Sequence, residues 1–290
     1  MIAAIAAAIS QATAMPFVPV RQAMMGGGCI NQAFKLSDGK RSFFVKTNGA
    51  DRLSMFEAEA AGLEEILASQ SLRAPRPVCY GTSGSAAWLV LEFLELGGRG
   101  SGAEMGRLLA HLHRTTGPRF GWKRDNTIGS TPQLNAWTDR WVDFLRDQRL
   151  GYQLQLAAQQ DYGTRLQSKG ERLCAGLDAF FSAYQPVPSL LHGDLWGGNA
   201  GYLTSGEPVV FDPAVYYGDR EADLAMTELF GGFGADFHAA YREAWPLDPG
   251  YGTRKTLYNL YHILNHAHLF GGGYVGQAQS MLDRLLAEIN

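Results

Sequence analysis

The segment 192–199, HGDLWGGN, places an aspartate and an asparagine on one short, glycine-containing loop. Asp194 follows His192 by two residues, and Asn199 follows Asp194 by five. A carboxylate can accept the proton of an alcohol, and an amide oxygen can ligate a hard cation without adding a second negative charge beside that base. The loop therefore predicts a site where Asp194 removes a proton while Asn199 holds a metal ion.

The same spacing occurs in the catalytic loop of protein kinases, H-R-D-L-x-x-x-N, where the aspartate is the base and the asparagine binds magnesium. Asp212 fits this pattern too, because it ends the apolar run 208–211 and follows Asn199 by thirteen residues. Kinase-like enzymes place a second metal ligand at such a position. We therefore predict that Asn199 and Asp212 bind Mg²⁺. The likeness to the Asp-Phe-Gly of protein kinases ends at Asp212, which is followed by Pro-Ala.

A glycine cluster upstream precedes two runs of β-strand composition, 32–36 and 41–46, joined by a turn of Asp-Gly type. In kinases a glycine loop covers the nucleotide phosphates, and a lysine on a following strand contacts them. Lys46 is therefore predicted to contact the phosphates of ATP, with Glu59 on the next helix as its partner and Glu57 as the alternative. The nucleotide contacts predicted from the glycine loop are Gly27, Gly28 and Cys29.

The segment LEFL, 91–94, ends the first part of the chain just before the glycine-rich stretch 97–102. A hinge near 92–98 would give adenine its main-chain hydrogen bonds, with predicted contacts at Glu92, Phe93 and Leu94. The glycine loop, strand lysine, acidic helix, hinge, base loop and strand-end aspartate follow one another in the kinase order. Together they predict an ATP-dependent phosphotransferase that binds the nucleotide in a cleft between two lobes.

Each feature also has an ordinary structural explanation when it is considered alone. A triple glycine is usually a loop, a strand lysine is usually a solvated charge, and an aspartate at a strand end often forms a turn. His192 could be a structural histidine. The conjunction of all the features in one order favours the phosphotransferase.

The pattern of apolar residues indicates which elements position these groups. We expect a small N-terminal lobe with an antiparallel sheet. Its elements are a short amphipathic helix at the N-terminus, the first hairpin, a helix over 53–69 and strands at 78–80 and 87–94. The rest is predicted to be mainly helical, over 103–115, 133–160, 163–184, 221–245, 252–270 and 274–289. This is an α+β, two-lobed, protein-kinase-like fold, with a nucleotide-binding lobe at 1–96 and a catalytic and substrate-binding lobe at 97–290.

Composition excludes several other classes of protein. The 290 residues carry a net charge of −3, which argues against a nucleic-acid partner. No stretch is long enough to span a membrane, and three scattered cysteines favour a reducing compartment, so we expect a cytoplasmic protein. Cys29 is expected to be exposed in the glycine loop. The chain is therefore predicted to be a monomer, or a dimer linked through Cys29 on oxidation.

The longer motifs resemble the fructosamine kinase (ketosamine-3-kinase) family, within the wider aminoglycoside-phosphotransferase and choline-kinase group. The most specific are LLHGDLWGGNAG (190–201) and FDPAVYYGDRE (211–221), supported by GWKRDNTIGSTPQLNAW (121–137) and LYHILNHAHLFGGGY (260–274). The resemblance implies that MgATP phosphorylates O3 of a ketosamine, the adduct of a sugar with a small or protein-bound amine. It leaves open ribulosamine, erythrulosamine or fructosamine as substrate. A kinase for another hydroxylated amine and a nucleotide-binding pseudoenzyme are the alternatives.

Three further residues are candidates for substrate contact. Trp196, inside the catalytic loop, could form a flat wall against the sugar, or it could be a core tryptophan. Asp219 or Glu221 could pair with the cationic amine of the substrate. In the alternative, Asp219 caps the helix that follows it and Asp223 bonds the catalytic loop.

Overall fold

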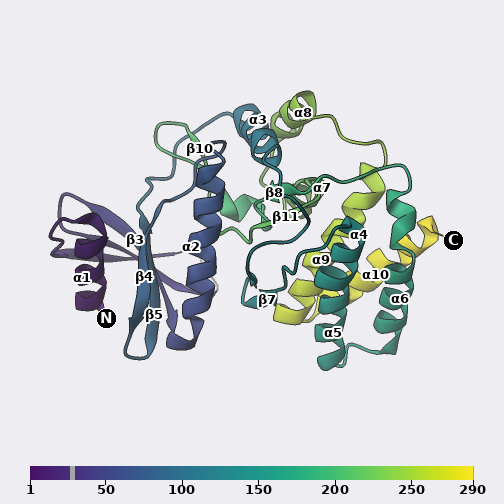
Figure 1. Cartoon of the computed structure of the whole chain (residues 1–290), viewed down its shortest axis with the longest axis horizontal. Coiled ribbons are helices and arrows are strands. Elements are labelled where there is room, and N and C mark those ends of the chain that lie inside the picture. The colour runs from purple at the N-terminus through teal and green to yellow at the C-terminus, as the bar shows by residue number, and fades with distance from the viewer. Residues whose placement is uncertain (27–29, 290) are drawn as a thin grey trace. The chain divides into compact units, whose positions relative to one another are not determined.

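The computed structural model describes residues 1–26 and 30–289 of the chain, and its contacts divide them into two compact units (Figure 1). The N-terminal unit consists of Met1–Ser101 and Ala200–Pro213, and the C-terminal unit consists of Gly102–Asn199 and Ala214–Asn290. This division differs from the expected boundary at 96/97 mainly because residues 200–213 return to the N-terminal unit. Asp212 therefore belongs with Lys46 and Glu59, whereas Asp194 and Asn199 belong to the C-terminal unit.

A five-stranded antiparallel sheet forms the centre of the N-terminal unit, in the order β1-β2-β3-β5-β4. Its strands are β1 (Arg21–Met25), β2 (Gln32–Ser37), β3 (Ser42–Gly49), β4 (Pro77–Ser83) and β5 (Ala86–Glu92). The predicted Asp-Gly hairpin is confirmed as β2–β3, with Ser37 opposite Ser42. Strand β1 was not expected, because all five of its residues are exposed and it has no alternating apolar pattern.

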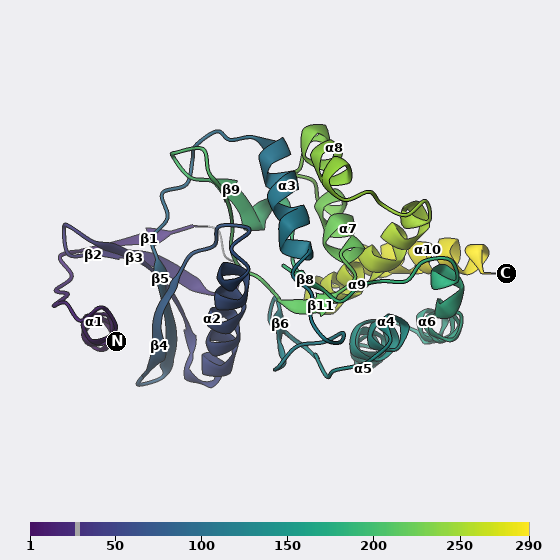
Figure 2. The same cartoon turned by 45° about the horizontal axis from the view of Figure 1, so that its top comes forward.

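Two helices cover this sheet on opposite faces, as Figures 1 and 2 both show: α1 (Ile2–Thr13) and α2 (Leu53–Ala68), the latter preceded by the 3₁₀ turn Ala50–Arg52. Ile5 and Ile9 of α1 are fully buried against the alternating apolar residues of β2, β3 and β5. The N-terminal apolar run is therefore a packed amphipathic helix, because its isoleucines recur at helical spacing.

The returning segment 200–213 forms a small two-stranded sheet of β9 (Ala200–Tyr202) and β10 (Pro208–Val210). The amide of Val210 donates to the carbonyl of Arg73 (2.9 Å), and the amide of Gly97 donates to the carbonyl of Tyr202 (3.2 Å). These main-chain bonds hold Asp212, which follows β10, within the N-terminal unit.

The C-terminal unit is mainly helical and contains two small antiparallel sheets of two strands each. Its helices are α3 (Gly102–His113), α4 (Trp141–Phe144), which continues through a π-helical segment (Leu145–Leu150) into α5 (Gly151–Gln159), α6 (Thr164–Ala175), α7 (Glu221–Leu229), α8 (Ala235–Ala244), α9 (Tyr251–Phe270) and α10 (Gly273–Glu288). Two 3₁₀ turns, Leu177–Phe181 and Gly197–Asn199, complete the helical elements. Its strands pair as β6 (Asn126–Ile128) with β7 (Thr131–Gln133) and β8 (Ser189–Leu191) with β11 (Tyr216–Gly218).

Three predicted helices end or begin at other residues than expected. The helix predicted over 133–160 begins only at Trp141, because the preceding residues form β7 and an extended segment. The helix predicted over 221–245 is two helices, since Gly231 and Gly232 have φ of +76° and +104°, which no continuous helix permits. The helix predicted over 163–184 stops at Ala175. In the described part of the chain, no helix combines the length and the apolar character needed to cross a membrane.

Candidate active site

A buried lysine in the N-terminal unit binds two carboxylates at once. The Lys46 Nζ atom lies 2.6 Å from Oε1 of Glu59 and 2.6 Å from Oδ1 of Asp212. Burial by itself would lower the pKa of Lys46, but the charges of Asp212 and Glu59 outweigh it and hold that pKa well above its usual value. Lys46 is therefore a permanent cation at neutral pH.

The fold explains why these three residues meet. Lys46 lies in β3, a central strand of the sheet, opposite Ala33 of β2 and Leu89 of β5. Glu59, the predicted partner, lies on α2 four residues before Leu63, which is fully buried. Burial raises the pKa of Glu59, and the Lys46 ammonium opposes that rise.

Asp212 occupies an unusual backbone conformation. Its φ of +57° lies in the left-handed region, which costs a non-glycine residue roughly 1–3 kcal/mol and is tolerated best by asparagine and aspartate. Its side chain is 46% exposed, while the bonded Lys46 side chain is 7% exposed. The carboxylate thus joins a buried cation on one side and reaches solvent on the other, as a ligand for a nucleotide-bound cation requires.

The predicted hinge follows β5 directly. The Glu92 side chain accepts hydrogen bonds from the Arg73 guanidinium and from the Arg76 amide, and the Glu92 amide donates to the Arg76 carbonyl. Phe93 and Leu94 come next, and the Lys35 ammonium lies 4.0 Å from the centroid of the Phe93 ring. The predicted adenine contacts at these positions remain predictions. The predicted glycine-loop contacts Gly27, Gly28 and Cys29 lie outside the described residues.

The C-terminal unit carries the predicted base. Asn199 donates from Nδ2 to both the carbonyl oxygen (2.9 Å) and Oδ2 (3.0 Å) of Asp194. These two bonds close the loop 194–199 on itself and fix the rotamer of the Asp194 carboxylate. Nδ2 is the donor in both bonds, so Oδ1 of Asn199 is the atom with the chemistry to ligate a hard cation.

A buried aspartate holds the start of this loop. Asp223, on the first turn of α7, accepts the amide of His192 on Oδ2 (2.7 Å) and the amide of Gly193 on Oδ1 (2.8 Å). Oδ2 also contacts Nε2 of His113 (3.1 Å). Burial would raise the pKa of Asp223, but the His113 contact and the loop amides hold it below its usual value. The alternative role expected for Asp223, bonding the catalytic loop, is confirmed.

Buried amide side chains also hold the main chain of residues 214 and 215, against which the same loop packs. The Ala214 amide donates to the His192 carbonyl (2.8 Å), and the Ala214 carbonyl accepts Nε2 of Gln133 (3.0 Å). The Asn126 Nδ2 atom donates to the Val215 carbonyl (2.8 Å), and its Oδ1 atom accepts Gln133 Nε2 (2.8 Å). Gln133 is therefore two hydrogen bonds away from the catalytic loop.

Gly193 shows how tightly this arrangement is packed. Its φ is +82°, and a Cβ atom there would lie 2.0 Å from the Ala214 carbonyl oxygen. Only glycine allows the catalytic loop to lie on residue 214 at this distance.

The two predicted partners of the substrate amine are buried and already have partners within the C-terminal unit. Asp219 is 0% exposed; it accepts the hydroxyls of Tyr184 (2.9 Å) and Tyr258 (2.5 Å) and the amide of Glu221. Glu221, also 0% exposed, binds the Arg254 guanidinium through both oxygens (2.7 and 3.0 Å). Burial raises the pKa of Glu221 to about 7, against the opposing effect of Arg254.

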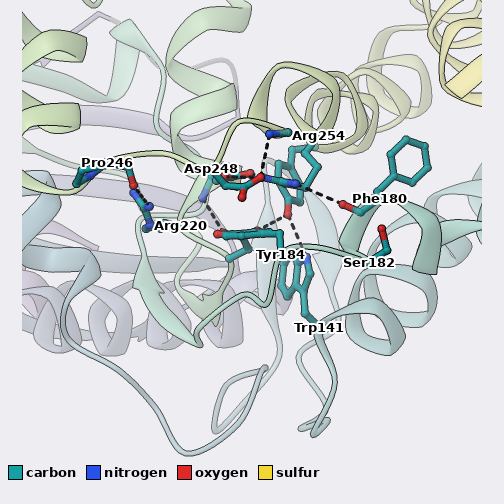
Figure 3. A network of polar contacts seen from close by, with 12 residues as sticks. Trp141, Phe180, Ser182, Tyr184, Arg220, Pro246, Asp248 and Arg254 are labelled. Carbon is teal, nitrogen blue, oxygen red and sulfur yellow. Dashed lines mark hydrogen bonds and ion pairs between the residues drawn. The ribbon is translucent and has the colours of Figure 1, made fainter.

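Figure 3 shows this network, with Tyr184 and Trp141 directed toward the same buried contacts and Arg254 above them. The proposed contact of Asp219 or Glu221 with a substrate amine does not match this burial, because neither carboxylate reaches solvent. The alternative for Asp219 agrees with its bond to the Glu221 amide at the start of α7. Trp196, in contrast, is 39% exposed and is no core residue.

Several residues of this site were not among the predicted ones. They are buried polar side chains that contact the loop or its support: His113, Asn126, Gln133, Asn135 and Tyr261. The signal that could have found some of them is the run NTIGSTPQLN (126–135), in which polar residues alternate with apolar ones around a Gly-Ser turn. This run was predicted to end in a helix, so its inward-facing amides were overlooked.

Comparison with known proteins agrees with this description. The model of the fructosamine kinase family matches residues 1–288. A probable ketoamine kinase of Synechocystis sp. is 52% identical over 286 residues, which are 97% of this chain and 96% of that protein. A chloroplastic protein-ribulosamine 3-kinase of Arabidopsis thaliana is 46% identical over 268 residues, which are 90% of this chain and 81% of that protein.

Solved structures are similar to this chain as well. The crystal structure of a Haemophilus somnus protein assigned to the fructosamine-3-kinases has a TM-score of 0.89 at 30% identity, covering 97% of this chain and 96% of that one. A crystal structure of an aminoglycoside phosphotransferase has a TM-score of 0.62 at 15% identity over 99% of both chains, a likeness of fold alone. These matches confirm the predicted α+β fold class. The chain belongs to the fructosamine kinase family of ATP-dependent phosphotransferases.

Proposed function

We propose that the protein is a ketosamine 3-kinase, which transfers the γ-phosphoryl group of MgATP to the O3 hydroxyl of a sugar–amine adduct. The observation that carries the proposal is the Asp194 carboxylate, held by Asn199 in a loop of phosphotransferase spacing. The relative at 46% identity is named a protein-ribulosamine 3-kinase, so ribulosamine is the substrate we place first, ahead of erythrulosamine and fructosamine.

We assign nucleotide binding to the N-terminal unit. Lys46 is a permanent cation that the phosphates of ATP can share with Glu59 and Asp212. The main chain at Phe93 and Leu94 is assigned to adenine.

Magnesium is the cation that the donor set fits. Asp212 offers a partly exposed carboxylate and Asn199 an amide oxygen, and both are hard oxygen donors of the kind that Mg²⁺ prefers. Bound there, Mg²⁺ would neutralise charge on the transferred phosphoryl group. The excess negative charge of Asp212 and Glu59 around one lysine also favours an added cation.

We assign Asp194 to the activation of the acceptor, the O3 hydroxyl of the ketosamine. Its carboxylate orients the O3 hydroxyl and accepts its proton as the oxygen attacks the γ-phosphorus. The new O3–P bond forms as the bond between the γ-phosphorus and the bridging oxygen breaks, and ADP leaves with that electron pair. A positioned base of this kind contributes on the order of 10²–10⁴-fold in rate.

The product of this reaction suggests a repair role. Loss of a proton from carbon 1 gives an enaminol, which can expel the phosphate from carbon 3. Water then hydrolyses the resulting imine, so the sugar fragment leaves as an aldehyde and the free amine is restored. We therefore propose deglycation of small or protein-bound amines as the role of the reaction.

The test is ADP release with MgATP and ribulosamine, erythrulosamine and fructosamine adducts of lysine. Asp194→Asn is measured beside the wild type, and nucleotide binding is measured for both. We expect turnover by the wild type, highest with ribulosamine, and at least a 100-fold loss in Asp194→Asn with nucleotide binding retained. ATP binding without turnover of any ketosamine would contradict the proposal, and turnover of another hydroxylated amine would replace it.

A further inference from the structure

Five aromatic rings of the C-terminal unit form a continuous row that begins inside the catalytic loop. The row runs from Trp196 to Phe230 and His266, and His266 contacts both Phe270 and Tyr274. The successive ring centroids lie 6.5 Å (Trp196–Phe230), 4.8 Å (Phe230–His266), 5.6 Å (His266–Phe270) and 5.1 Å (His266–Tyr274) apart. These spacings are those of interacting aromatic pairs. We call these five residues the aromatic row.

Contacts of Gly197 with Gly231 and Gly232 bring the row to the catalytic loop. The Gly197 amide donates to the Gly231 carbonyl (3.2 Å), and a Cβ atom on Gly232 would lie 2.4 Å from Cα of Gly197. Gly231 and Gly232 both have positive φ, which turns the chain sharply after α7. The turn between α7 and α8 therefore lies directly on the catalytic loop, and this contact seats Phe230 beside Trp196.

Three of the five members of the row are exposed, and the other two, His266 and Tyr274, are half-buried. In the described part of the C-terminal unit, the large hydrophobic side chains that are exposed are Val187 and three members of the row: Trp196 (39%), Phe230 (39%) and Phe270 (59%). Apolar groups gathered on the surface next to a catalytic loop indicate a binding surface rather than unused exposure. Burial lowers the pKa of His266, so this ring is uncharged at neutral pH and the row carries no positive charge.

We propose that the aromatic row is the subsite for the amine-bearing part of the ketosamine, the carrier to which the sugar is attached. This inference rests on the proposed function and deepens it. A ketosamine carries its amine on carbon 1, two carbons from the O3 hydroxyl that Asp194 would activate. Trp196 lies in the same short loop as Asp194, so the start of the row is where we place the amine of a substrate bound at Asp194.

The chemistry of the row selects one kind of carrier. The secondary amine is a cation at neutral pH, which the faces of Trp196 and Phe230 attract. Beyond the amine, the uncharged rings at His266 and Phe270 suit an alkyl chain and offer nothing to a carboxylate. The carrier that fits is a lysine side chain, in which four methylenes follow the amine.

Two variants distinguish the binding contribution of the amine from that of the alkyl chain. The substrates are ribulosamine adducts of methylamine and of Nα-acetyl-lysine methylamide, which share the sugar and the cation and differ in the chain. Phe270→Ala should lower kcat/KM for the lysine adduct by about 5- to 20-fold, since each buried methylene contributes several-fold, and leave the methylamine adduct unchanged. Phe230→Leu should lower kcat/KM for both adducts, because both carry the cation. The control is Tyr80→Ala, which removes an exposed aromatic ring of β4 and should change neither.

Equal effects of Phe270→Ala on the two adducts, or no effect on either, would overturn the assignment. So would self-association of the wild type that Phe270→Ala abolishes without a change in carrier preference, because the row would then be an interface between copies. A binding measurement keeps the inference independent of turnover. The 3-deoxy lysine adduct cannot be phosphorylated, and its calorimetric affinity for the ADP-bound protein should fall in Phe270→Ala. Absent or unchanged binding argues against the row even if the kinase reaction itself fails.

Discussion

Asn199 holds Asp194 through a single amide nitrogen, which lies 2.9 Å from the main-chain oxygen and 3.0 Å from the carboxylate of Asp194. The residue assigned to the metal therefore also sets the orientation of the residue assigned to the base. Loss of Asn199 should remove both contributions at once.

Asn199→Ala is expected to lower kcat by at least 100-fold, because a misplaced base and a lost metal ligand both raise the barrier. Asn199→Asp keeps an oxygen donor but replaces the donor nitrogen by a second carboxylate beside Asp194, so it should also be strongly impaired. The measurement is kcat as a function of Mg²⁺ concentration. Restoration of Asn199→Asp to wild-type kcat by high Mg²⁺ would show that the bonds to Asp194 are dispensable.

Lys46→Met should lower kcat/KM for ATP by roughly 10²- to 10³-fold, the usual effect of removing one group that stabilises the transition-state charge. The pKa of Lys46 is raised above its usual 10.5. A raised pKa means that the cation persists in the folded protein as pH rises, so Lys46 should cause no loss of activity between pH 6 and 10. A pH–rate profile compares the wild type with Lys46→Arg, and an alkaline limb near pH 8 that shifts in Lys46→Arg would contradict this assignment.

The pair of Glu221 and Arg254 should contribute to stability and not to substrate binding. Arg254→Leu leaves the buried Glu221 carboxylate without its cation, which is expected to cost about 3–5 kcal/mol of unfolding free energy. Glu221→Gln should lower the melting temperature while KM for the ketosamine stays within twofold. A large rise in that KM with an unchanged melting temperature would restore Glu221 as a substrate contact.

Gln133→Met should impair the catalytic loop without touching the substrate. It removes the Nε2 donor that the Ala214 carbonyl accepts and the oxygen that accepts the Tyr261 hydroxyl, and a buried group left unsatisfied costs about 1–3 kcal/mol. We expect kcat to fall while KM for ATP is unchanged. The control is Asn259→Leu, which replaces another buried amide side chain, on α9. Equal losses of kcat in both variants would indicate general destabilisation.

His262 should make the protein less stable in acid. It is buried on α9, and burial lowers its pKa to about 3, against the opposing effect of Asp223. Between pH 6.5 and 3 the unfolded chain binds a proton at this residue and the folded chain does not, so stability is full above pH 6.5 and falls as pH decreases.

Urea unfolding at pH 7, 6, 5 and 4 measures this effect. His262→Asn should reduce the slope of unfolding free energy against pH by up to about 1.4 kcal/mol per pH unit. Parallel curves for the wild type and His262→Asn would show that His262 binds its proton equally in both states.

The sequence alone predicted the contact of Lys46 with Glu59 and the shared loop of Asp194 and Asn199, because these signals are local. Lys46 ends an apolar strand run, and Glu59 shares a helix face with Leu63, so their contact follows from strand and helix periodicity. Asp194 and Asn199 lie in one short loop. The α+β fold class follows from the change between these two periodicities along the chain.

Burial of polar groups could not be predicted in the same way. Asp219 and Glu221 have the composition of an exposed helix start, and only the tertiary positions of Tyr258 and Arg254, more than thirty residues later, show that they are internal. The helix predicted across Gln133 failed for a similar reason. The side chain of Gln133 is directed to the main chain of residue 214, about eighty positions away, and no local pattern encodes such a contact.

The return of residues 200–213 to the N-terminal unit has a consequence for the order of biosynthesis. Lys46 is made early, but its partner Asp212 lies 166 positions later in the chain. The strands β1 to β5 can form as soon as they leave the ribosome, whereas the β9–β10 hairpin and Asp212 cannot join them until the catalytic loop has also been made. A fragment that ends at residue 101 would therefore contain the sheet and the lysine but lack one of the lysine's two counter-charges. The N-terminal unit becomes complete only when about three-quarters of the polypeptide has been translated.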